Sequence, residues 1–200
     1  MYKSIFIILS LSLFSCIEFK SDYPETTYYK LSEEDINLDT PKFGGGILIK
    51  DINLPTWVNI DYLTEYKENN IIERYYYHKW SNNLKLQVHN LIKNRIITQN
   101  NFKKGVLNFS SKNVARYILE IDILDLVAND EDNGNMVEIK SNVKVFLNNN
   151  SVNENILFNK VYKFEIERSD DELTSIPLDY SILIAKLTDA FLMDMKDAVN

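Results

Sequence analysis

Residues 117–127 read YILEIDILDLV, and this stretch decides the fold class. Apolar side chains stand at every second position, as Leu119, Ile121 and Ile123. The intervening positions carry Glu120, Asp122 and Leu124. Because successive side chains of a strand point to opposite faces, a period of two indicates one buried face and one face in water. The stretch therefore predicts a strand of a half-buried sheet.

Two further segments, Val137–Leu147 and Ile156–Glu167, show the same alternation. Polar segments rich in Asn, at 129–135 and 148–155, separate them from each other and from the first strand. Such segments are typical of turns between neighbouring antiparallel strands. We therefore expect three consecutive antiparallel strands in the second half of the chain.

The first half contains three shorter β-prone segments, at Thr27–Leu31, Ile47–Leu54 and Ile71–Tyr77. A glycine triplet, Gly44–Gly46, precedes the second of them. It lacks the Lys-Ser/Thr pair and the spaced glycines of phosphate-binding loops, and a strand rather than a helix follows it. We interpret the triplet as a flexible start of a strand.

Two helices follow from apolar residues at helical spacing. The first would begin after Ser81, a residue type suited to an N-cap, and fade near Gln99. Its apolar stripe is Trp80, Leu84, Val88, Leu91, Ile92 and Ile96. The second helix follows Pro177, with the stripe Tyr180, Leu183, Ile184, Leu187, Phe191 and Met195. The expected fold is α+β, with two layers: a mostly antiparallel sheet and two helices packed on one face.

The composition excludes one class of partner. The chain has 200 residues, 45% of them hydrophobic and 12% aromatic, which suits a single globular domain with a real core. Its formal net charge is −7, and it has no basic block. Because binding to phosphates needs clustered Lys and Arg, we expect no nucleic-acid partner.

The N-terminal residues have the pattern of a lipoprotein signal peptide. Residues 1–15 read MYKSIFIILSLSLFS, with an apolar run too short to span a bilayer, which needs about 20 residues. Leu13-Phe14-Ser15-Cys16 follows the lipobox pattern, with an aliphatic residue at −3, a small residue at −1 and cysteine at +1. The pattern predicts cleavage between Ser15 and Cys16 and lipidation of Cys16. An ordinary cleaved signal peptide with a cysteine nearby is the alternative.

This pattern divides the chain into a signal peptide (1–15), a lipidated N-terminus and tether (16–27) and one α+β domain (28–200). Cys16 is the only cysteine, so no disulfide can form within one chain. The diacylglycerol and N-acyl lipid on Cys16 are the only attached groups we expect, with no other cofactor. Ile17 stands where Asp would favour the inner membrane. The periplasmic face of the outer membrane is therefore the expected location, and inner-membrane anchoring stays open.

The sequence offers little catalytic or metal chemistry. The two histidines, His78 and His89, share no metal-ligand spacing. The acidic segments 130–132 and 170–172 are interpreted as a solvated turn and as residues near a helix N-terminus. No nucleophile elbow, P-loop or dinucleotide motif is present in the sequence. We expect no catalytic residue, no metal site and no enzymatic activity.

Four motifs in order carry a resemblance to a known family. They are Tyr28-Tyr29-Lys30-Leu31 near the lipidated cysteine, Leu54-Pro55 at a strand end, Tyr62-Leu63, and His78–Leu84 (HKWSNNL) at a helix start. In this order the chain resembles the ABC-type transport auxiliary lipoproteins, the Pqi-type partners of MCE-domain lipid transporters. Lys79 replaces the family's Arg, and the segment from Pro55 to Tyr62 is longer than usual.

The resemblance implies a non-enzymatic adaptor at the outer membrane, which docks on the MCE-domain protein of an ABC transporter that moves lipids between the two membranes. Exposed aromatic residues suit interfaces. The candidate docking residues are Trp57, Tyr62, Tyr66, Tyr75, Tyr76 and Tyr77. Whether the chain also forms a homo-oligomer stays open.

Two other classes of function compete with the adaptor. One is an outer-membrane assembly lipoprotein of the lipopolysaccharide-transport or TolB-like type. The other is a surface lipoprotein that acts as an adhesin or binds lipid itself. Both would share the lipid anchor and differ in their partner.

Overall fold

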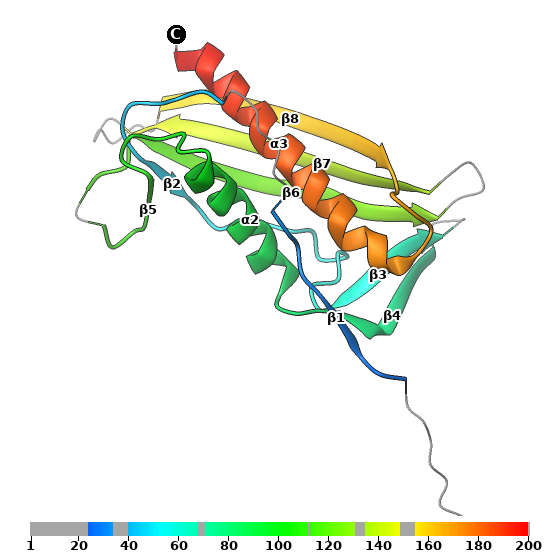
Figure 1. Ribbon diagram of the computed structural model, residues 1–200. Coiled ribbons are helices and arrows are strands. Elements are labelled where there is room, and N and C mark those ends of the chain that lie inside the picture. The colour runs from blue at the N-terminus through cyan, green and yellow to red at the C-terminus, as the bar shows by residue number, and fades with distance from the viewer. Residues whose placement is uncertain are drawn as a thin grey trace, which may run out of the picture.

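The computed structural model describes residues 24–33, 40–67, 71–111, 113–130, 135–148 and 155–199. Within these ranges the chain forms an eight-stranded mixed sheet. Two helices, α2 (Leu84–Thr98) and α3 (Ile176–Val199), cover one face of it (Figure 1). This arrangement confirms the predicted α+β class.

Three long strands form the larger part of the sheet, as their alternation predicts. They are β6 (Tyr117–Asp130), β7 (Met136–Leu147) and β8 (Asn155–Glu167), and each is antiparallel to the next. The side chains that face the helices form the core together with the apolar stripes of α2 and α3. Because this face is buried and the other is wet, the register of the three strands is well determined.

The alternation in β6 shifts by one residue after Ile123. Pairing with β7 passes from Ile123–Ser141 to Asp125–Lys140, so Leu124 is an additional residue in a β-bulge. Beyond the bulge Leu126 and Ala128 occupy the buried face. The bulge moves Asp125 to the face that points away from the helices.

A hairpin of β3 (Tyr62–Lys67) and β4 (Ile71–Trp80) extends the sheet. β4 is three residues longer than predicted, and β3 was not predicted as a separate strand. The inward positions of β3 are Leu63 and Glu65, and both are buried. A charged residue at an inward position, between the half-buried Thr64 and Tyr66, breaks the apolar alternation that identifies a strand in sequence.

Three short strands complete the sheet through parallel pairings: β1 (Thr27–Tyr29) with β4, and β2 (Ile47–Ile49) with both β5 (Val106–Leu107) and β6. β2 is shorter than the predicted Ile47–Leu54. Its chain still follows β6, because the amides of Lys50 and Asn53 donate to the carbonyls of Leu119 and Ile121. Gly46 lies close to the neighbouring strand, since a Cβ there would be 2.8 Å from Leu107 Cδ1 and 3.2 Å from the Gly105 carbonyl oxygen, so the Leu107 side chain would have to shift.

Helix α2 buries the predicted stripe from Leu84 to Ile96, but Trp80 belongs to β4 and the helix does not begin at Ser81. That prediction was wrong, because the Ser81 amide donates to the carbonyl of Tyr29 in the neighbouring strand β1, at 2.7 Å. Asn83 occupies the cap position, and its side chain makes no capping hydrogen bond. The amide of Leu84 instead donates to the carbonyl of Ile60 at 3.1 Å, which satisfies one of the free amides of the first turn.

Helix α3 begins at Ile176, directly after a 3₁₀ turn at Leu173–Ser175. Pro177 lies in its first turn, where a missing amide hydrogen costs nothing. Its whole predicted stripe is buried, and Tyr180 stacks on Trp80 with ring centroids 6.1 Å apart. Arg95 of α2 and Asp189 of α3 form a bidentate pair at 2.8 and 2.6 Å, which fixes the two helices side by side.

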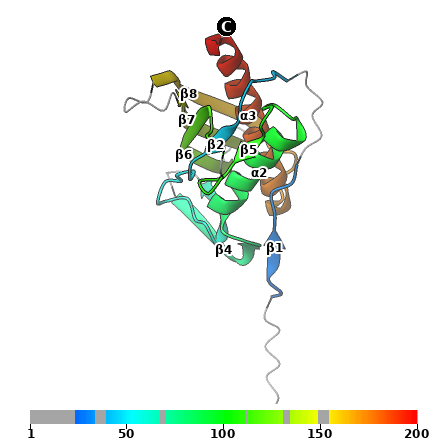
Figure 2. The same ribbon diagram turned by 90° about the vertical axis from the view of Figure 1, so that its left-hand side faces the viewer.

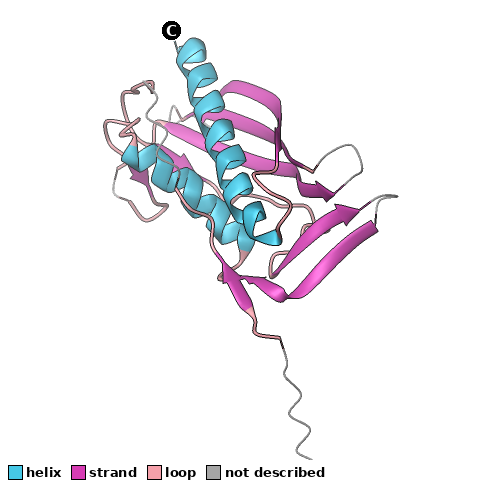
Figure 3. Cartoon of the chain, turned by 45° about the vertical axis from the view of Figure 1, so that its right-hand side comes forward, coloured by secondary structure: helices cyan, strands magenta, loops and turns pink. Residues whose placement is uncertain are grey.

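The two ends of the described chain lie at opposite ends of the molecule. Figure 2 shows β1 at one end and the C-terminal part of α3 at the other. The β3–β4 hairpin and the first turns of both helices lie toward the β1 end (Figures 1 and 3). We call this the β1 end below.

Candidate functional site

Three tyrosines, the exposed Tyr28 and Tyr76 and the half-buried Tyr62, gather on one face of the three strands at the β1 end. Lys79 of β4 pairs with Tyr28 of β1 on one side and with Tyr62 of β3 on the other. The ring of Tyr76 meets that of Tyr62 edge-on at 5.5 Å, and Lys79 Nζ lies 5.2 Å from the Tyr62 ring centroid. We call Tyr28, Tyr62, Tyr76 and Lys79 the tyrosine surface.

The alternation of the strands explains why this surface faces outward. Trp80 and Tyr29, the next residues of β4 and β1, pair with each other and point into the core. Their neighbours Lys79 and Tyr28 must therefore point away from it. Tyr28 is 63% exposed and Tyr76 is 62% exposed, so most of the surface of these two rings is uncovered by the described chain.

The six predicted docking residues do not form one surface. Tyr62 and Tyr76 lie together, and Tyr77 is exposed in the irregular part of β4 beside them. Trp57 is half-buried and packs against the core. Nothing in the geometry tests whether any of them binds a partner, so that role stays a prediction.

Tyr66 and Tyr75, the other two, are held within the fold. Tyr66 is half-buried, and burial together with the nearby Asp125 carboxylate raises the pKa of its phenol. Tyr75 lies opposite Leu63, on the inward side of the hairpin. Its hydroxyl donates to Glu65 at 2.6 Å and to Glu73 at 3.0 Å. Burial and these carboxylates raise the pKa of Tyr75 far above its ordinary value, so the phenol stays a neutral donor.

A buried ion pair holds the hairpin to the rest of the domain. Arg168, after the end of β8, donates to Glu65 of β3 at 2.6 Å, and both side chains are almost fully buried, at 1% and 4% exposed. The guanidinium also donates to the carbonyl of Glu172 at 2.8 Å. Lys67 and Tyr75 bind the other carboxylate oxygen of Glu65. The hairpin that carries the tyrosine surface is thereby fixed to the start of α3.

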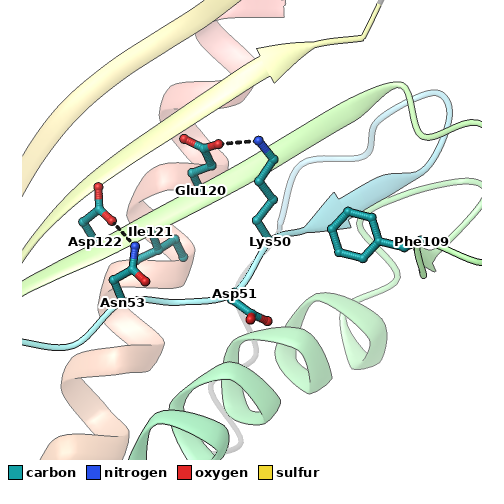
Figure 4. Close-up of a pocket in the computed structure, with 7 residues that line it drawn as sticks. All are labelled: Lys50, Asp51, Asn53, Phe109, Glu120, Ile121 and Asp122. Atoms are coloured by element: carbon teal, nitrogen blue, oxygen red, sulfur yellow. Dashed lines mark hydrogen bonds and ion pairs between the residues drawn. The ribbon is translucent and has the colours of Figure 1, made fainter.

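A pocket of about 400 Å³ lies along β2 and β6 (Figure 4). Its walls are Lys50, Asp51, Asn53, Phe109, Glu120, Ile121 and Asp122. Lys50 forms an ion pair with Glu120, and the Asn53 amide donates to Asp122 at 2.7 Å. The polar side chains thus bind one another across the pocket, and a ligand there would have to compete with them.

A second pocket, of about 410 Å³, lies between α2 and the segment after β1. Its central side chain is the buried Gln87, which accepts from the Leu31 amide and donates to the Asn82 carbonyl, both at 2.9 Å. These bonds hold the segment after β1 on the helix. Most of the other lining residues are Asn, Ser, Lys or Glu, so the pocket suits polar groups rather than acyl chains.

The histidines lie apart from each other. His78 Nδ1 is 2.8 Å from the hydroxyl of Tyr29, between β1 and β4. Burial and Lys93 lower the pKa of His89, on α2. Among the described residues no three His, Cys, Asp or Glu side chains gather as metal ligands.

The predicted cleavage and lipidation residues, Ser15 and Cys16, lie outside the described residues. In the described ranges, no helix has both the length and the apolar character to cross a membrane.

Two features of the site were missed at the sequence level. Tyr28 and Lys79 appeared only as motif positions, although their alternation with the core residues Tyr29 and Trp80 indicates that they face outward. The pair of Glu65 and Arg168 leaves no local pattern, because its members are 103 positions apart in the chain. Only a long-range contact prediction could have found it.

Comparison with known proteins shows the fold alone. No protein-family model matches the chain, and no curated protein matches it in sequence. Protein XCC0632 from Xanthomonas campestris, of the family DUF330, superposes with a TM-score of 0.72 at 10% identity, over 88% of this chain and 100% of its own. An uncharacterised protein gives 0.63 at 11% identity, over 86% and 99%. The hypothetical protein CT253 from Chlamydia trachomatis gives 0.51 at 10% identity, over 76% and 98%.

Proposed function

We propose that the chain is a non-enzymatic lipoprotein, anchored through Cys16 at the periplasmic face of the outer membrane. The observation that carries this proposal is the position of the only cysteine, at the +1 site of Leu13-Phe14-Ser15-Cys16. Two acyl chains on the glycerol and one on the amino group exceed the two signals that stable anchoring needs.

The structure fits a domain held close to a membrane. Pro24, the first described residue, follows Cys16 by eight positions. At roughly 3.3–3.6 Å per residue, these positions span at most about 26–29 Å. The anchor would therefore hold the β1 end near the bilayer and leave the C-terminal end of α3 free to point into the periplasm.

We further propose that the domain serves as the auxiliary component of an MCE-type ABC transport system. The order of Tyr28–Leu31, Leu54-Pro55, Tyr62-Leu63 and His78–Leu84 supports this role. Three of the motifs, Tyr28–Leu31, Tyr62-Leu63 and His78–Leu84, are joined at the β1 end through the pairing of β4 with β1 and with β3. The Trp80 amide donates to the Asp61 carbonyl, and the Leu31 amide binds Gln87 of α2. These motif residues thus hold the strands and the start of α2 together, and they do not form separate binding sites.

The two pockets favour an adaptor over a lipid-binding module. A site for acyl chains is a mainly apolar cavity. The pocket along β2 and β6 has four charged residues in its wall, and the pocket beside α2 has Gln87 and several Asn side chains. We therefore expect the domain to act through its surface and through a protein partner.

Co-purification tests the adaptor role. The full chain, tagged at its C-terminus and solubilised in mild detergent, is expected to bring down the MCE-domain protein of the same cell. An unrelated outer-membrane lipoprotein with the same tag measures the background. Recovery of the MCE-domain protein at background level only would overturn the adaptor role and leave the lipid anchor untouched.

A further inference from the structure

We propose that the tyrosine surface rests on the bilayer that holds Cys16, with Tyr28 and Tyr76 at the level of the lipid headgroups. The inference depends on the proposed lipidation of Cys16. It goes beyond that proposal, because it assigns a binding surface to the folded domain.

The first argument is the place where the tether enters the fold. Tyr28 follows Cys16 by twelve positions, which span at most about 40–43 Å when fully extended. The tether leads directly into β1, and Tyr28 lies on that strand beside Lys79. The other members of the surface follow on the next two strands, β4 and β3. The lipid anchor is therefore joined to the strand that starts the surface.

The second argument is the chemistry of the surface. Tyrosine has an apolar ring and a polar hydroxyl, and it is enriched where a membrane meets water. Tyr28 and Tyr76 are each exposed by more than three fifths, and Lys79 adds an amine beside the Tyr62 ring. A lysine at this position can bind lipid phosphates while its stem lies along the aromatic ring.

The third argument is the contrast with the rest of the same sheet face. On β6, β7 and β8 this face carries ion pairs, with Lys144 near Asp122 at 3.9 Å and Lys163 near Glu138 at 3.1 Å. Within the hairpin strands, Glu73 is bound by Tyr75 and Lys67 on the opposite side, and the exposed Asp61 stands just before Tyr62. Near the tether this face thus presents aromatic rings and the amine of Lys79, and away from the tether it carries ion pairs.

A protein occupant fits the geometry less well. A partner that reaches across the periplasm approaches the end of the domain that points away from the membrane. The tyrosine surface lies at the β1 end, opposite the C-terminal part of α3 (Figure 2). We therefore assign the surface to lipid and leave the far end of the domain to the partner.

Spin labels on the full lipidated chain test the inference. Lipidation occupies the native thiol, so Tyr76→Cys introduces a unique site, and Tyr28→Cys provides a second one if the first variant fails to fold. The control is Phe109→Cys, a 77% exposed position two residues after β5, and β5 lies away from β1 (Figure 1). The labelled proteins are reconstituted on vesicles of phosphatidylethanolamine and phosphatidylglycerol. For each spin label, the rate of collision with oxygen, which concentrates in lipid, is then compared with the rate of collision with a nickel chelate in the water.

The expected result is a several-fold higher oxygen-to-nickel ratio at Tyr76 and Tyr28 than at Phe109. Labels at Tyr76 and Tyr28 that stay aqueous on vesicle-bound protein would overturn the membrane contact. Labels that become protected from the nickel chelate only when the MCE-domain protein is added would also overturn the membrane contact, because the surface would then bind protein. Protein that fails to float with the vesicles would refute the lipid anchor together with this inference, so the two failures are distinguishable.

Discussion

Glu65 and Arg168 show how much of this fold depends on a few buried polar residues. Arg168 neutralises the carboxylate of Glu65 where water cannot reach either group. A buried pair adds little net stability compared with apolar residues, but loss of one member leaves an unpaired buried charge. The pair is therefore required for the docked position of the hairpin.

Arg168→Met is expected to lower the free energy of unfolding by about 1–3 kcal/mol, because the buried Glu65 Oε1 would lose its donor and only Lys67 would remain to balance the carboxylate. Urea denaturation of the domain measures the change. Lys163→Met, in an exposed ion pair with Glu138, is the matched control and is expected to change little. Equal stability of both variants would refute the structural role of the pair.

Asp125 is an acid that the β-bulge places in a half-buried position. Its Oδ1 is buried and has no hydrogen-bond partner in the described part of the chain. Burial raises the pKa of Asp125 above its ordinary value of 3.8, although nearby lysines oppose the shift. Because the folded form binds the proton more tightly than the unfolded form, the ionised carboxylate destabilises the fold at neutral pH.

Asp125→Asn is therefore expected to stabilise the domain at pH 7, by about 0.5 kcal/mol or less, since the site is partly exposed. The gain should shrink as the pH falls through the raised pKa of Asp125 toward 3.8, where the parent carboxyl is also neutral. Urea titrations at several pH values measure it. A gain that does not depend on pH would point to a cause other than ionisation.

At the scale of elements, the sequence predicted those segments whose pattern follows one rule along their length. α3 agrees with its periodicity, and β6 agrees as far as its bulge. The alternation of β7 holds up to Val145 and that of β8 from Phe158 onward, because their pairing shifts between these residues and the strand ends and leaves Ile156 60% exposed. β3 escaped prediction because Glu65 stands at an inward position, where its partner comes from the distant Arg168. The start of α2 was misplaced because a strand pairing with β1 and the carbonyl of Ile60 replace the expected serine cap.

Helix α3 is expected to be the element whose packing matters most for stability, since its stripe closes the core over the sheet. Phe191→Ala removes a fully buried ring and should cost about 3–5 kcal/mol in the free energy of unfolding. Met193→Ala, two positions away on the exposed side of the same helix, should have a small effect. Similar losses for both variants, measured by urea denaturation, would contradict the described orientation of α3.

At the scale of the whole molecule, the tether and the exposed tyrosines lie at the same end. The sequence indicated which aromatic residues could be exposed, and the fold selected among them. Tyr62 and Tyr76 join Tyr28 and Lys79 on the tyrosine surface, whereas Tyr75 serves the Glu65 network and Trp57 packs on the core. Periodicity could not make this selection, because the pairing of β1 with β4 joins segments about 50 residues apart.

The central claim is that Cys16 anchors the domain, and intact-mass and peptide mass spectrometry of the protein isolated from membranes tests it most directly. We expect a mature chain that lacks residues 1–15 and begins at Cys16, with a diacylglycerol thioether and an amide-linked acyl chain. The variant Cys16→Ala is expected to keep residues 1–15 and carry no lipid. A parent protein with a free thiol at Cys16, or with its N-terminus elsewhere, would contradict the account.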